Sequence, residues 1–457
     1  MRKNNKSNFE KIAGAPAMAL DHSLGKTAEV VNSLPDVKVL DKTKNYWKML
    51  GPGLTTGASD DDPSGIATYS QTGAQTGFSL LWLAPLTYPL MSVVQEMCAR
   101  IGIVTGRGLA GNIRIHFSRK VLYACALLLF AANAFNIGAD LGAMAKGAQL
   151  LRPSLSFGWL VVGFAILCLA LQIFTNYAQY ARYLKWLALV LFAYIFSALM
   201  AHLPWADIVR ATFTPHVNFN KEEILLICAI LGTTISPYLF FWQTSQEVEE
   251  QIVDGKTTIA SRQGSSKKAV KRMRIDVWSG MFLSNLVMFF IIAACGGILF
   301  PNGITSITSA SQAAEALRPF AGNATFLLFA VGIIGTGLLA IPVLAGASSY
   351  AMSEAFGWKS GLYRPLRQAH SFYGVIIFSM LAGVALNFIG LNPIKALIYS
   401  AIGNGLVAPI VLVLVVLISS NKKIMGEWVN KKYITFIGWF VILLMSAAGI
   451  AAIFALF

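Results

Sequence analysis

Charged residues are scarce in this chain of 457 amino acids. They make up 12% of it, whereas hydrophobic residues make up 56%, and a soluble domain carries about 25% charged residues. This shortage excludes an ordinary soluble protein and predicts an all-α polytopic membrane protein. The net charge of +15 is spread over many short loops and not along a groove with interleaved aromatic residues, so we expect no nucleic-acid binding.

The chain also lacks closely spaced cysteine pairs and histidines in the middle of apolar segments. Its five cysteines lie within or at the ends of apolar runs, without a Cys-x-x-Cys pair, which argues against disulfides and a zinc site. Imidazole ligands are therefore not expected in the core, and neither is a bound cofactor. Residues 1–45 contain no apolar stretch, so we interpret them as a cytoplasmic tail and not as a signal peptide.

Eleven apolar stretches reach the length of about 20 residues that a membrane-spanning helix needs. They lie near 46–76, 79–101, 121–149, 156–175, 183–203, 222–248, 276–299, 323–350, 371–390, 394–418 and 433–456. With the N-terminus inside, 30 of the 36 Lys and Arg residues fall in the tail and in the loops after even-numbered segments, and five fall outside. This bias predicts a plasma-membrane protein with a cytoplasmic N-terminus and an external C-terminus.

Three consecutive carboxylates interrupt the first segment. Asp60, Asp61 and Asp62 are followed by Pro63 and, two residues later, Gly65. A carboxylate at mid-membrane depth is costly and usually faces a cavity or an ion path. Proline removes a backbone donor, and the carbonyls freed at a helix break need partners, which a cation can supply. We therefore predict a broken helix that holds a metal ion.

Segment 6 carries a second interruption, at Ser236 and Pro237. Segments 1 and 6 open two groups of five segments, 46–203 and 222–418, and a final segment, 433–456, follows. An odd repeat length inverts the second group in the membrane, and paired interruptions at corresponding places indicate a binding site near the midplane. The sequence therefore predicts two inverted repeats around a site formed by broken helices 1 and 6.

Every candidate ligand at the two breaks is an oxygen. The predicted ligands are the Asp62 carboxylate, backbone carbonyls near Ser59 and Gly65, the Thr233 carbonyl and the Ser236 hydroxyl. Such a set suits Mg²⁺, Ca²⁺ or Mn²⁺ better than Fe²⁺, Zn²⁺ or Cd²⁺. One turn cannot aim three successive carboxylates at one point. Asp60 and Asp61 are thus expected to line a vestibule or attract cations, and solvated cavity walls without ion contact are an equal alternative.

Five motifs resemble those of the Nramp divalent-metal transporters. They are Gly51-Pro52-Gly53, Asp62-Pro63, Ala74-Gln-Thr-Gly-Phe-Ser-Leu-Leu-Trp82, Ala99-Arg-Ile-Gly-Ile-Val-Thr-Gly106 and Thr234-x-x-Pro237. The resemblance covers nearly all eleven segments. It implies a LeuT-like fold with segments 1–5 and 6–10 as the inverted repeats.

The departures from the family pattern fall at the two breaks. Typical members have Asp-Pro-Gly-Asn in segment 1, where this chain ends the motif on Gly65, and Met-Pro-His in segment 6, where it has Ser236-Pro237-Tyr238. This pattern is similar to that of the Nramp-related magnesium transporters. That similarity implies import of Mg²⁺, and also Mn²⁺, by alternating access. The smaller residues leave room for a partly hydrated ion, which Mg²⁺ favours because it releases water reluctantly.

The proton pathway of typical family members is also altered. Their segment 3 carboxylates align with Asn136 and Ala139, although Asp140 follows, and Asn404 lies one turn from the position of a coordinating glutamine. With Tyr238, these residues are candidates for the vestibule or the second coordination shell. We therefore expect transport without obligatory proton coupling, because a divalent ion moving inward gains roughly 4.6 kcal/mol per 100 mV.

Several alternatives stay open. Asp140, Glu96 and Lys146 could carry protons in a proton-coupled Mn²⁺/Fe²⁺ symporter, although structural roles are favoured. An intramembrane aspartyl hydrolase would need acids in separate spans, and a sodium-coupled amino-acid carrier would meet repulsion from three aspartates. We expect a monomeric transporter of a bacterial inner membrane, and no enzyme. The basic loop 256–274 could dock on anionic lipid headgroups, although ordinary topology bias explains its charge as well.

Overall fold

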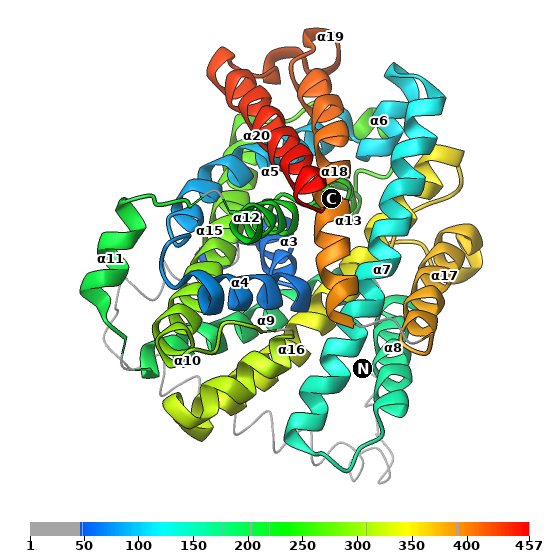
Figure 1. The fold of residues 1–457 in the computed structure, drawn as a ribbon. Coiled ribbons are helices and arrows are strands. Elements are labelled where there is room, and N and C mark those ends of the chain that lie inside the picture. Colours follow the sequence, from blue (N-terminus) through cyan, green and yellow to red (C-terminus); the bar gives the residue numbers. More distant parts are fainter. Residues whose placement is uncertain are drawn as a thin grey trace, which may run out of the picture. The chain divides into compact units, whose positions relative to one another are not determined.

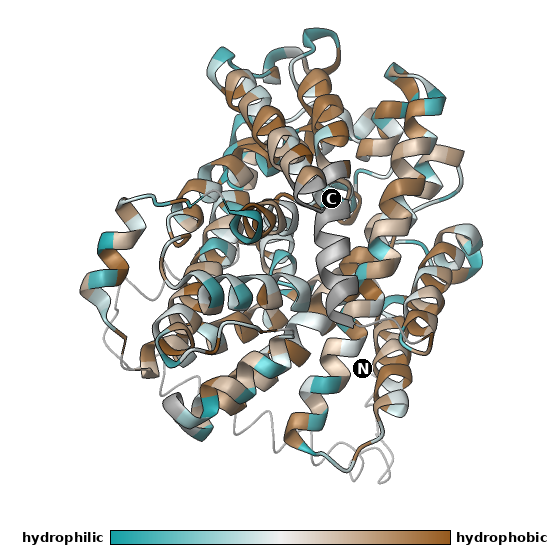
Figure 2. Cartoon of the chain, viewed as in Figure 1, coloured by the Kyte–Doolittle hydropathy of each residue, from teal (hydrophilic) through white to brown (hydrophobic). Residues whose placement is uncertain are grey.

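The computed structural model describes residues 46–457, apart from 48, 176, 202, 219, 308, 390–392 and 457. Leu50–Phe457 forms one compact unit. The tail predicted for 1–45 lies outside the described residues. All regular elements of the described part are helices (Figure 1). Apolar residues cover most of these helices, and hydrophilic residues gather in loops and at helix ends (Figure 2). The prediction of an all-α membrane protein is confirmed.

The first five predicted segments form helices in order. Segment 1 consists of α3 (Pro52–Asp60) and α4 (Pro63–Thr76). The next elements are α5 (Leu83–Thr105), α6 (Leu109–His116), α7 (Arg119–Leu151), α8 (Phe157–Phe174), α9 (Tyr177–Leu187), η1 (Ala188–Leu191), α10 (Phe192–Met200) and α11 (Trp205–Phe213).

The remaining predicted segments also form helices. Segment 6 consists of α12 (Lys221–Thr234) and α13 (Pro237–Val253). The next elements are α14 (Ile259–Arg262), α15 (Lys267–Ile298), η2 (Phe300–Asn302), α16 (Ala310–Phe356), η3 (Leu366–Gln368), α17 (His370–Leu386), α18 (Pro393–Ser419), α19 (Lys422–Met425), η4 (Gly426–Trp428) and α20 (Lys432–Leu456).

The described residues contain several helical stretches of membrane-spanning length. Within the described residues, seven helical stretches are long and apolar enough to cross a membrane, or eight if one bent pair near Ser419 counts as a span. Helices occupy all eleven predicted ranges, but some are too short or too polar for that criterion, such as the 17-residue α17. The multi-pass architecture is confirmed, whereas the count of eleven and the repeat boundaries stay predictions.

Helix α3 packs against α15 at van der Waals distance of the backbones, which glycines on both helices allow. A Cβ atom added to Gly280 of α15 would lie 2.0 Å from the Gly53 carbonyl oxygen, and one added to Gly57 would lie 2.2 Å from the Gly280 oxygen. Both distances are far below any real contact, so only glycine fits at these places. The interface therefore fixes α3 closely on α15.

The start of α3 is held by side chains from other helices. Asp276 of α15 accepts hydrogen bonds from the backbone N–H groups of Gly51, Gly53 and Leu54, at 2.7, 2.7 and 3.0 Å. Lys185 of α9 donates to the Leu50 carbonyl at 2.7 Å. The carboxylate satisfies donors that a helix start leaves open and also complements the positive end of the helix dipole. It thus replaces the N-cap side chain that α3 lacks.

Four basic loops meet at one end of the molecule. A cavity of about 540 Å³ is lined by Arg107, Gln263 and Lys423, from the loops after segments 2, 6 and 10. A neighbouring cavity of about 550 Å³ is lined by Arg107, Arg262 and Trp358, and so adds the loop after segment 8. The positive-inside topology requires these loops to share one side of the membrane. Which side that is stays a prediction.

Candidate cation site at two helix breaks

The first break lies between α3 and α4, where the sequence predicted it. Asp61 leaves the helical conformation with φ −84° and ψ 54°, and Asp62 is extended with φ −68° and ψ 167°. Pro63 then starts α4, a position where its missing N–H costs nothing. Asp62 caps α4, because its Oδ1 accepts hydrogen bonds from the Gly65 N–H at 2.7 Å and the Ser64 hydroxyl at 2.6 Å.

The second break lies between α12 and α13, also as predicted. Ile235 has φ −110° and ψ 59°, Ser236 is extended, and Pro237 starts α13. The Ser236 hydroxyl lies 2.7 Å from the Gly232 carbonyl oxygen and 2.8 Å from that of Thr233, close enough to donate to either. It covers carbonyls at the end of α12 that would otherwise lack partners.

The two breaks face each other. Tyr238 of α13 donates its hydroxyl to the Ser59 carbonyl of α3 at 2.9 Å, and the hydroxyls of Tyr69 and Thr234 lie 3.3 Å apart. A Cβ atom added to Gly65 would lie 3.2 Å from the Thr233 hydroxyl oxygen. The predicted site residues of segments 1 and 6 therefore come together.

The three aspartates of the first break are buried. Asp60 and Asp61 are 0% exposed and Asp62 is 1% exposed. Ser284 of α15 lies near the first two, with its hydroxyl 2.9 Å from Asp60 Oδ2 and 3.4 Å from Asp61 Oδ1. Within the described residues, the other oxygens, Asp60 Oδ1 and Asp61 Oδ2, have no hydrogen-bond partner. No ion pair joins these three aspartates to a Lys or Arg within the described residues, so no basic side chain compensates this charge.

Asp140 of α7 brings a fourth buried carboxylate to the first break. It is close enough to Asp62 for the two charges to interact. Neither of its oxygens has a hydrogen bond of normal geometry to another described residue. Asn136, one helical turn earlier, is also buried. Burying uncompensated anions is very unfavourable unless a cation or protons neutralise them.

Helix α18 reaches the second break near Asn404. That side chain is buried, and its Oδ1 has no hydrogen-bond partner in the described part of the chain. A Cβ atom on the adjacent Gly405 would lie 3.6 Å from the Gly232 Cα. The Asn404 side chain thus has an oxygen without a described hydrogen-bond partner near the second break, where it was predicted as a candidate for the vestibule or the second coordination shell.

The arrangement of the predicted ligands differs in detail from the expectation. Tyr238 occupies one lone pair of the Ser59 carbonyl, and the Ser236 hydroxyl donates to backbone carbonyls. Asp62 Oδ2 accepts no hydrogen bond from the described residues. Among these residues, no three Asp, Glu, His or Cys side chains converge on one point as metal ligands. The ligand roles, including that of Asp62 as the single carboxylate ligand, stay predictions.

Sequence reasoning missed Ser284 and Tyr69 as neighbours of the breaks. Tyr69 is one of many polar residues in α4, and Ser284 stands next to Asn285 in α15. The sequence therefore held no signal that these two residues meet Thr234 and the aspartates. The candidate proton carriers lie apart from one another. Glu96 pairs with Arg274 at 2.8 Å and with Arg100 at 3.6 Å, and Lys146 lies 5.2 Å from the centre of the Phe157 ring.

A search of protein families matches residues 53–455 to one family, described as natural resistance-associated macrophage protein-like, or Nramp. The chain belongs to the Nramp family. This Nramp chain is 26% identical, over 401 residues, to the divalent metal cation transporter MntH of Klebsiella pneumoniae subsp. pneumoniae, covering 86% of this chain and 91% of that protein. It is also 26% identical to MntH of Caldanaerobacter subterraneus over 396 residues, with coverage of 85% and 88%.

Solved structures support the fold. The manganese transporter of Eremococcus coleocola, in complex with an aromatic bis-isothiourea substituted compound, matches with a TM-score of 0.68 at 18% identity. The match covers 89% of this Nramp chain and 86% of the transporter. The family expectation from the sequence motifs is therefore confirmed, and these relatives are named as transporters and not as enzymes.

Proposed function

We propose that this protein imports Mg²⁺, and also Mn²⁺, across the plasma membrane by alternating access around the two helix breaks. One observation carries the proposal: four carboxylates, those of Asp60, Asp61, Asp62 and Asp140, are buried together without a paired Lys or Arg among the described residues. A divalent cation supplies the missing positive charge. Broken helices supply backbone carbonyls to the same place.

The chemistry of the surrounding groups favours a hard ion. The predicted ligands are carboxylate, carbonyl and hydroxyl oxygens of Ser59, Asp62, Gly65, Thr233 and Ser236. The Met288 sulfur lies nearby, 3.8 Å from the Thr234 hydroxyl oxygen, but it is not among them. Oxygen ligands suit Mg²⁺ and Mn²⁺, and a thioether that would favour softer ions is absent at Ser236. The Eremococcus coleocola relative is named as a manganese transporter, which supports Mn²⁺ as a second substrate.

We propose further that transport is not coupled to protons. Tyr238 occupies the place of the family's histidine, and its hydroxyl is used in a hydrogen bond to Ser59. A phenol titrates near pH 10 and exchanges no proton at neutral pH. The membrane potential alone would drive a divalent cation inward.

The alternative function is a proton-coupled Mn²⁺/Fe²⁺ symporter. Asp140 favours it, because this buried carboxylate next to Asp62 has no hydrogen bond of normal geometry among the described residues. A proton could neutralise Asp140 when the metal leaves. The two functions therefore differ in whether Asp140 binds a proton during the transport cycle.

The predicted surroundings of the transporter complete the proposal. The clustering of four basic loops supports a common cytoplasmic side, with the N-terminus inside, the C-terminus outside and a bacterial inner membrane as the location. A monomer and lipid contacts of the loop 256–274 stay predictions.

Purified protein in liposomes tests the proposal directly. Uptake of Mg²⁺, Mn²⁺ and Ca²⁺ is titrated at a potential fixed by a potassium gradient, with a pH dye in the lumen. The expected result is saturable Mg²⁺ and Mn²⁺ uptake that rises with inside-negative potential and leaves the lumenal pH unchanged. Acidification in fixed proportion to Mn²⁺ uptake would establish the symporter instead, and absence of Mg²⁺ uptake would overturn the Mg²⁺ assignment.

A further inference from the structure

A second polar cavity lies away from the helix breaks, at the end of the molecule where the basic loops meet. It measures about 550 Å³, within the usual range for small-molecule sites. Its walls come from α6, α13, α14, the end of α16 and the loop that follows α16. We propose that this cavity binds a phosphate-bearing anion through the guanidinium groups of Arg107, Arg114 and Arg119.

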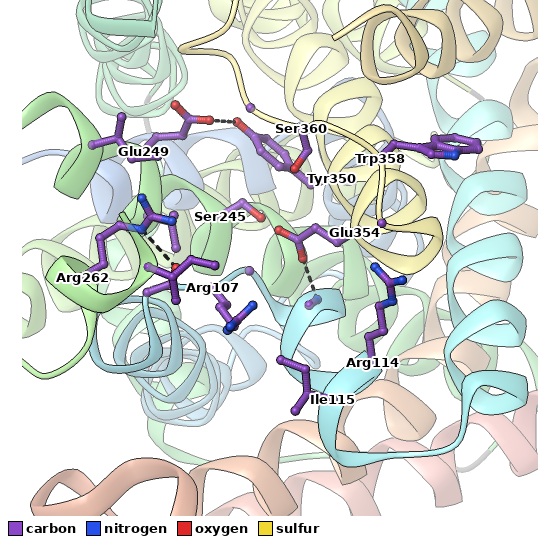
Figure 3. Close-up of a pocket in the computed structure, with 18 of the residues that line it drawn as sticks. Arg107, Arg114, Ile115, Ser245, Glu249, Arg262, Tyr350, Glu354, Trp358 and Ser360 are labelled. Carbon is purple, nitrogen blue, oxygen red and sulfur yellow. Dashed lines mark hydrogen bonds between the residues drawn. The ribbon is translucent and has the colours of Figure 1, made fainter. Parts of the chain in front are cut away.

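These arginines lie within one stretch of the chain, 107–119, and line the cavity together. Figure 3 shows Arg107 and Arg114 at the cavity. Arg107 precedes α6, Arg114 lies on α6, and Arg119 begins α7. The ion pairs and side-chain hydrogen bonds of the described residues leave all three guanidinium groups without an acceptor. Three unpaired cations around one cavity repel one another unless an anion lies between them.

A fourth arginine, Arg262, serves a different purpose. Its guanidinium donates to the carbonyls of Gly106, Lys256 and Thr257, at 3.1, 3.1 and 2.9 Å. It thereby ties the loop after α13 to the end of α5. Arg262 adds positive charge to the cavity wall, and its hydrogen bonds hold the segment that carries Arg107.

The two carboxylates in the wall accept hydrogen bonds from other groups. The charge of Arg107 acts on Glu354, but no ion pair joins the two side chains within the described residues. Glu249 accepts from the Tyr350 hydroxyl at 2.7 Å and from the N–H groups of Leu362 and Tyr363 at 2.9 and 3.1 Å. Glu354 accepts from the Gly111 N–H at 2.8 Å. These bonds fasten the loop after α16 and the start of α6. The four arginines outnumber the two carboxylates, so the cavity keeps a net positive charge.

The chemistry of guanidinium selects the ligand class. Arginine presents a planar fork of donors that matches phosphate oxygens in pairs, and it remains charged at all physiological pH values. A phosphate group has enough acceptors to contact several arginines at once. Simple halides lack that geometry.

Two sources could supply such a group. Trp358 and Tyr363 line the same cavity and are 41% and 37% exposed, as expected of aromatic side chains at headgroup depth, so an anionic lipid headgroup could reach the arginines. A soluble phosphate or pyrophosphate could enter from the aqueous side. The recognition chemistry is the same in both cases.

The test uses the full-length protein with the double variant R107Q/R114Q. R367Q is the matched control, because Arg367 is exposed in the loop after α16 and does not line the cavity. Pyrophosphate binding is measured by titration calorimetry in detergent, and retained lipid by native mass spectrometry after reconstitution with phosphatidylglycerol or phosphatidylcholine. The variant R107K/R114K keeps the charge but loses the paired geometry.

We expect R107Q/R114Q to weaken pyrophosphate binding or phosphatidylglycerol retention by roughly tenfold or more. R107K/R114K should bind with an affinity between those of R107Q/R114Q and the wild type. R367Q should bind as the wild type does. Retention of phosphatidylglycerol that pyrophosphate does not displace identifies a lipid. Pyrophosphate binding without lipid selectivity identifies a soluble ligand. Equal binding by R107Q/R114Q and R367Q overturns the proposal.

The proposal is independent of the transported ion. The variant D62N should lose transport but keep anion binding, because Asp62 does not line this cavity. Loss of anion binding in D62N, in protein that remains folded by size-exclusion chromatography, would mean that the arginine cavity is not a separate site.

Discussion

The two helix breaks use the same backbone interruption but different side chains. At the first, Asp62 caps the helix that follows the break and keeps one carboxylate oxygen unbonded within the described residues. At the second, Ser236 covers the end of the helix that precedes the break, and no acid is present. The difference indicates a division of roles. We expect the first break to supply the negative charge of the proposed site, and the second to set the size and hardness of its opposite wall.

Helix dipoles reinforce this division. The start of α4 places backbone N–H groups against Asp62, and the positive end of its dipole suits a carboxylate. The end of α12 presents carbonyls, which suit a cation. Substitutions at the first break, at Asp62, should therefore change the binding of all divalent ions. Substitutions at the second break, at Ser236, should change the selectivity among these ions.

The largest effect is expected from removing the charge at the first break. D62A should lower Mg²⁺ uptake into liposomes by about 100-fold or more, because loss of a metal ligand exceeds the 10- to 100-fold cost of losing its supporting groups. D254A is the control, since Asp254 is exposed after α13. Transport by folded D62A at the wild-type rate would refute the role of Asp62.

A softer ligand at the second break should change selectivity. S236M places a thioether where the family carries one, and it should raise the affinity for Cd²⁺ relative to Mg²⁺ by roughly tenfold. Calorimetry with both ions measures the ratio. S236A separates the loss of the hydroxyl from the gain of sulfur. If S236A and S236M shift the ratio of Cd²⁺ to Mg²⁺ affinity equally, the sulfur does not contribute to selectivity. That result would contradict the proposed role of the second break in selecting hard ions.

Restoring the family's asparagine in segment 1 should narrow the space between the breaks. A Cβ atom at Gly65 would already lie 3.2 Å from the Thr233 hydroxyl and 3.3 Å from the Asp60 carbonyl oxygen. G65N should therefore cost on the order of 1 kcal/mol, or about fivefold in Mg²⁺ affinity. G65A, with only the Cβ, should have a smaller effect. Equal or tighter Mg²⁺ binding by G65N would contradict the need for room around a hydrated ion.

The smallest effect is expected from removing the hydrogen bond between Tyr238 and the Ser59 carbonyl, which joins the two breaks. Y238F removes the hydrogen bond to Ser59 and should lower the free energy of unfolding by about 1 kcal/mol. Y373F, which removes a bond to Arg364 at 2.8 Å, should cost a similar amount. Only Y238F should also weaken Mg²⁺ binding, measured by calorimetry. An equal loss of Mg²⁺ affinity in Y373F would show that the loss in Y238F comes from lower overall stability and not from the hydrogen bond to Ser59.

The sequence was sufficient to locate both breaks, because two interruptions with proline, glycine and polar residues fall at corresponding places in segments 1 and 6. A single proline would not have been enough, since Pro89, Pro342 and Pro409 lie inside continuous helices. It also placed Asp62, Ser236 and Tyr238 on facing walls, which follows from the pairing of segments 1 and 6. It did not reveal that Tyr238 binds the Ser59 carbonyl or that Ser284 reaches Asp60. Those contacts depend on helix rotation and register, which a hydropathy pattern leaves open.

The short helices were also beyond the sequence. Helices α6 and α11 have 8 and 9 residues, well below the 20-residue window that detects a span. The arginine cavity depends on α6 and was missed for that reason. The charge of the loop after α13 was noticed, but its role in holding Arg107 beside three other loops required the fold.

The contact between α3 and α15 limits how these two helices can move relative to each other. The two backbones are in direct contact at Gly53, Gly57 and Gly280. Asp276 accepts three hydrogen bonds from the start of α3. Sliding by one residue would break all three bonds at once. We therefore expect α3 to move together with α15 as one rigid body, with Asp61 and Asp62 as the hinge. If α3 instead separates from α15, it should do so in one step, without a stable intermediate position.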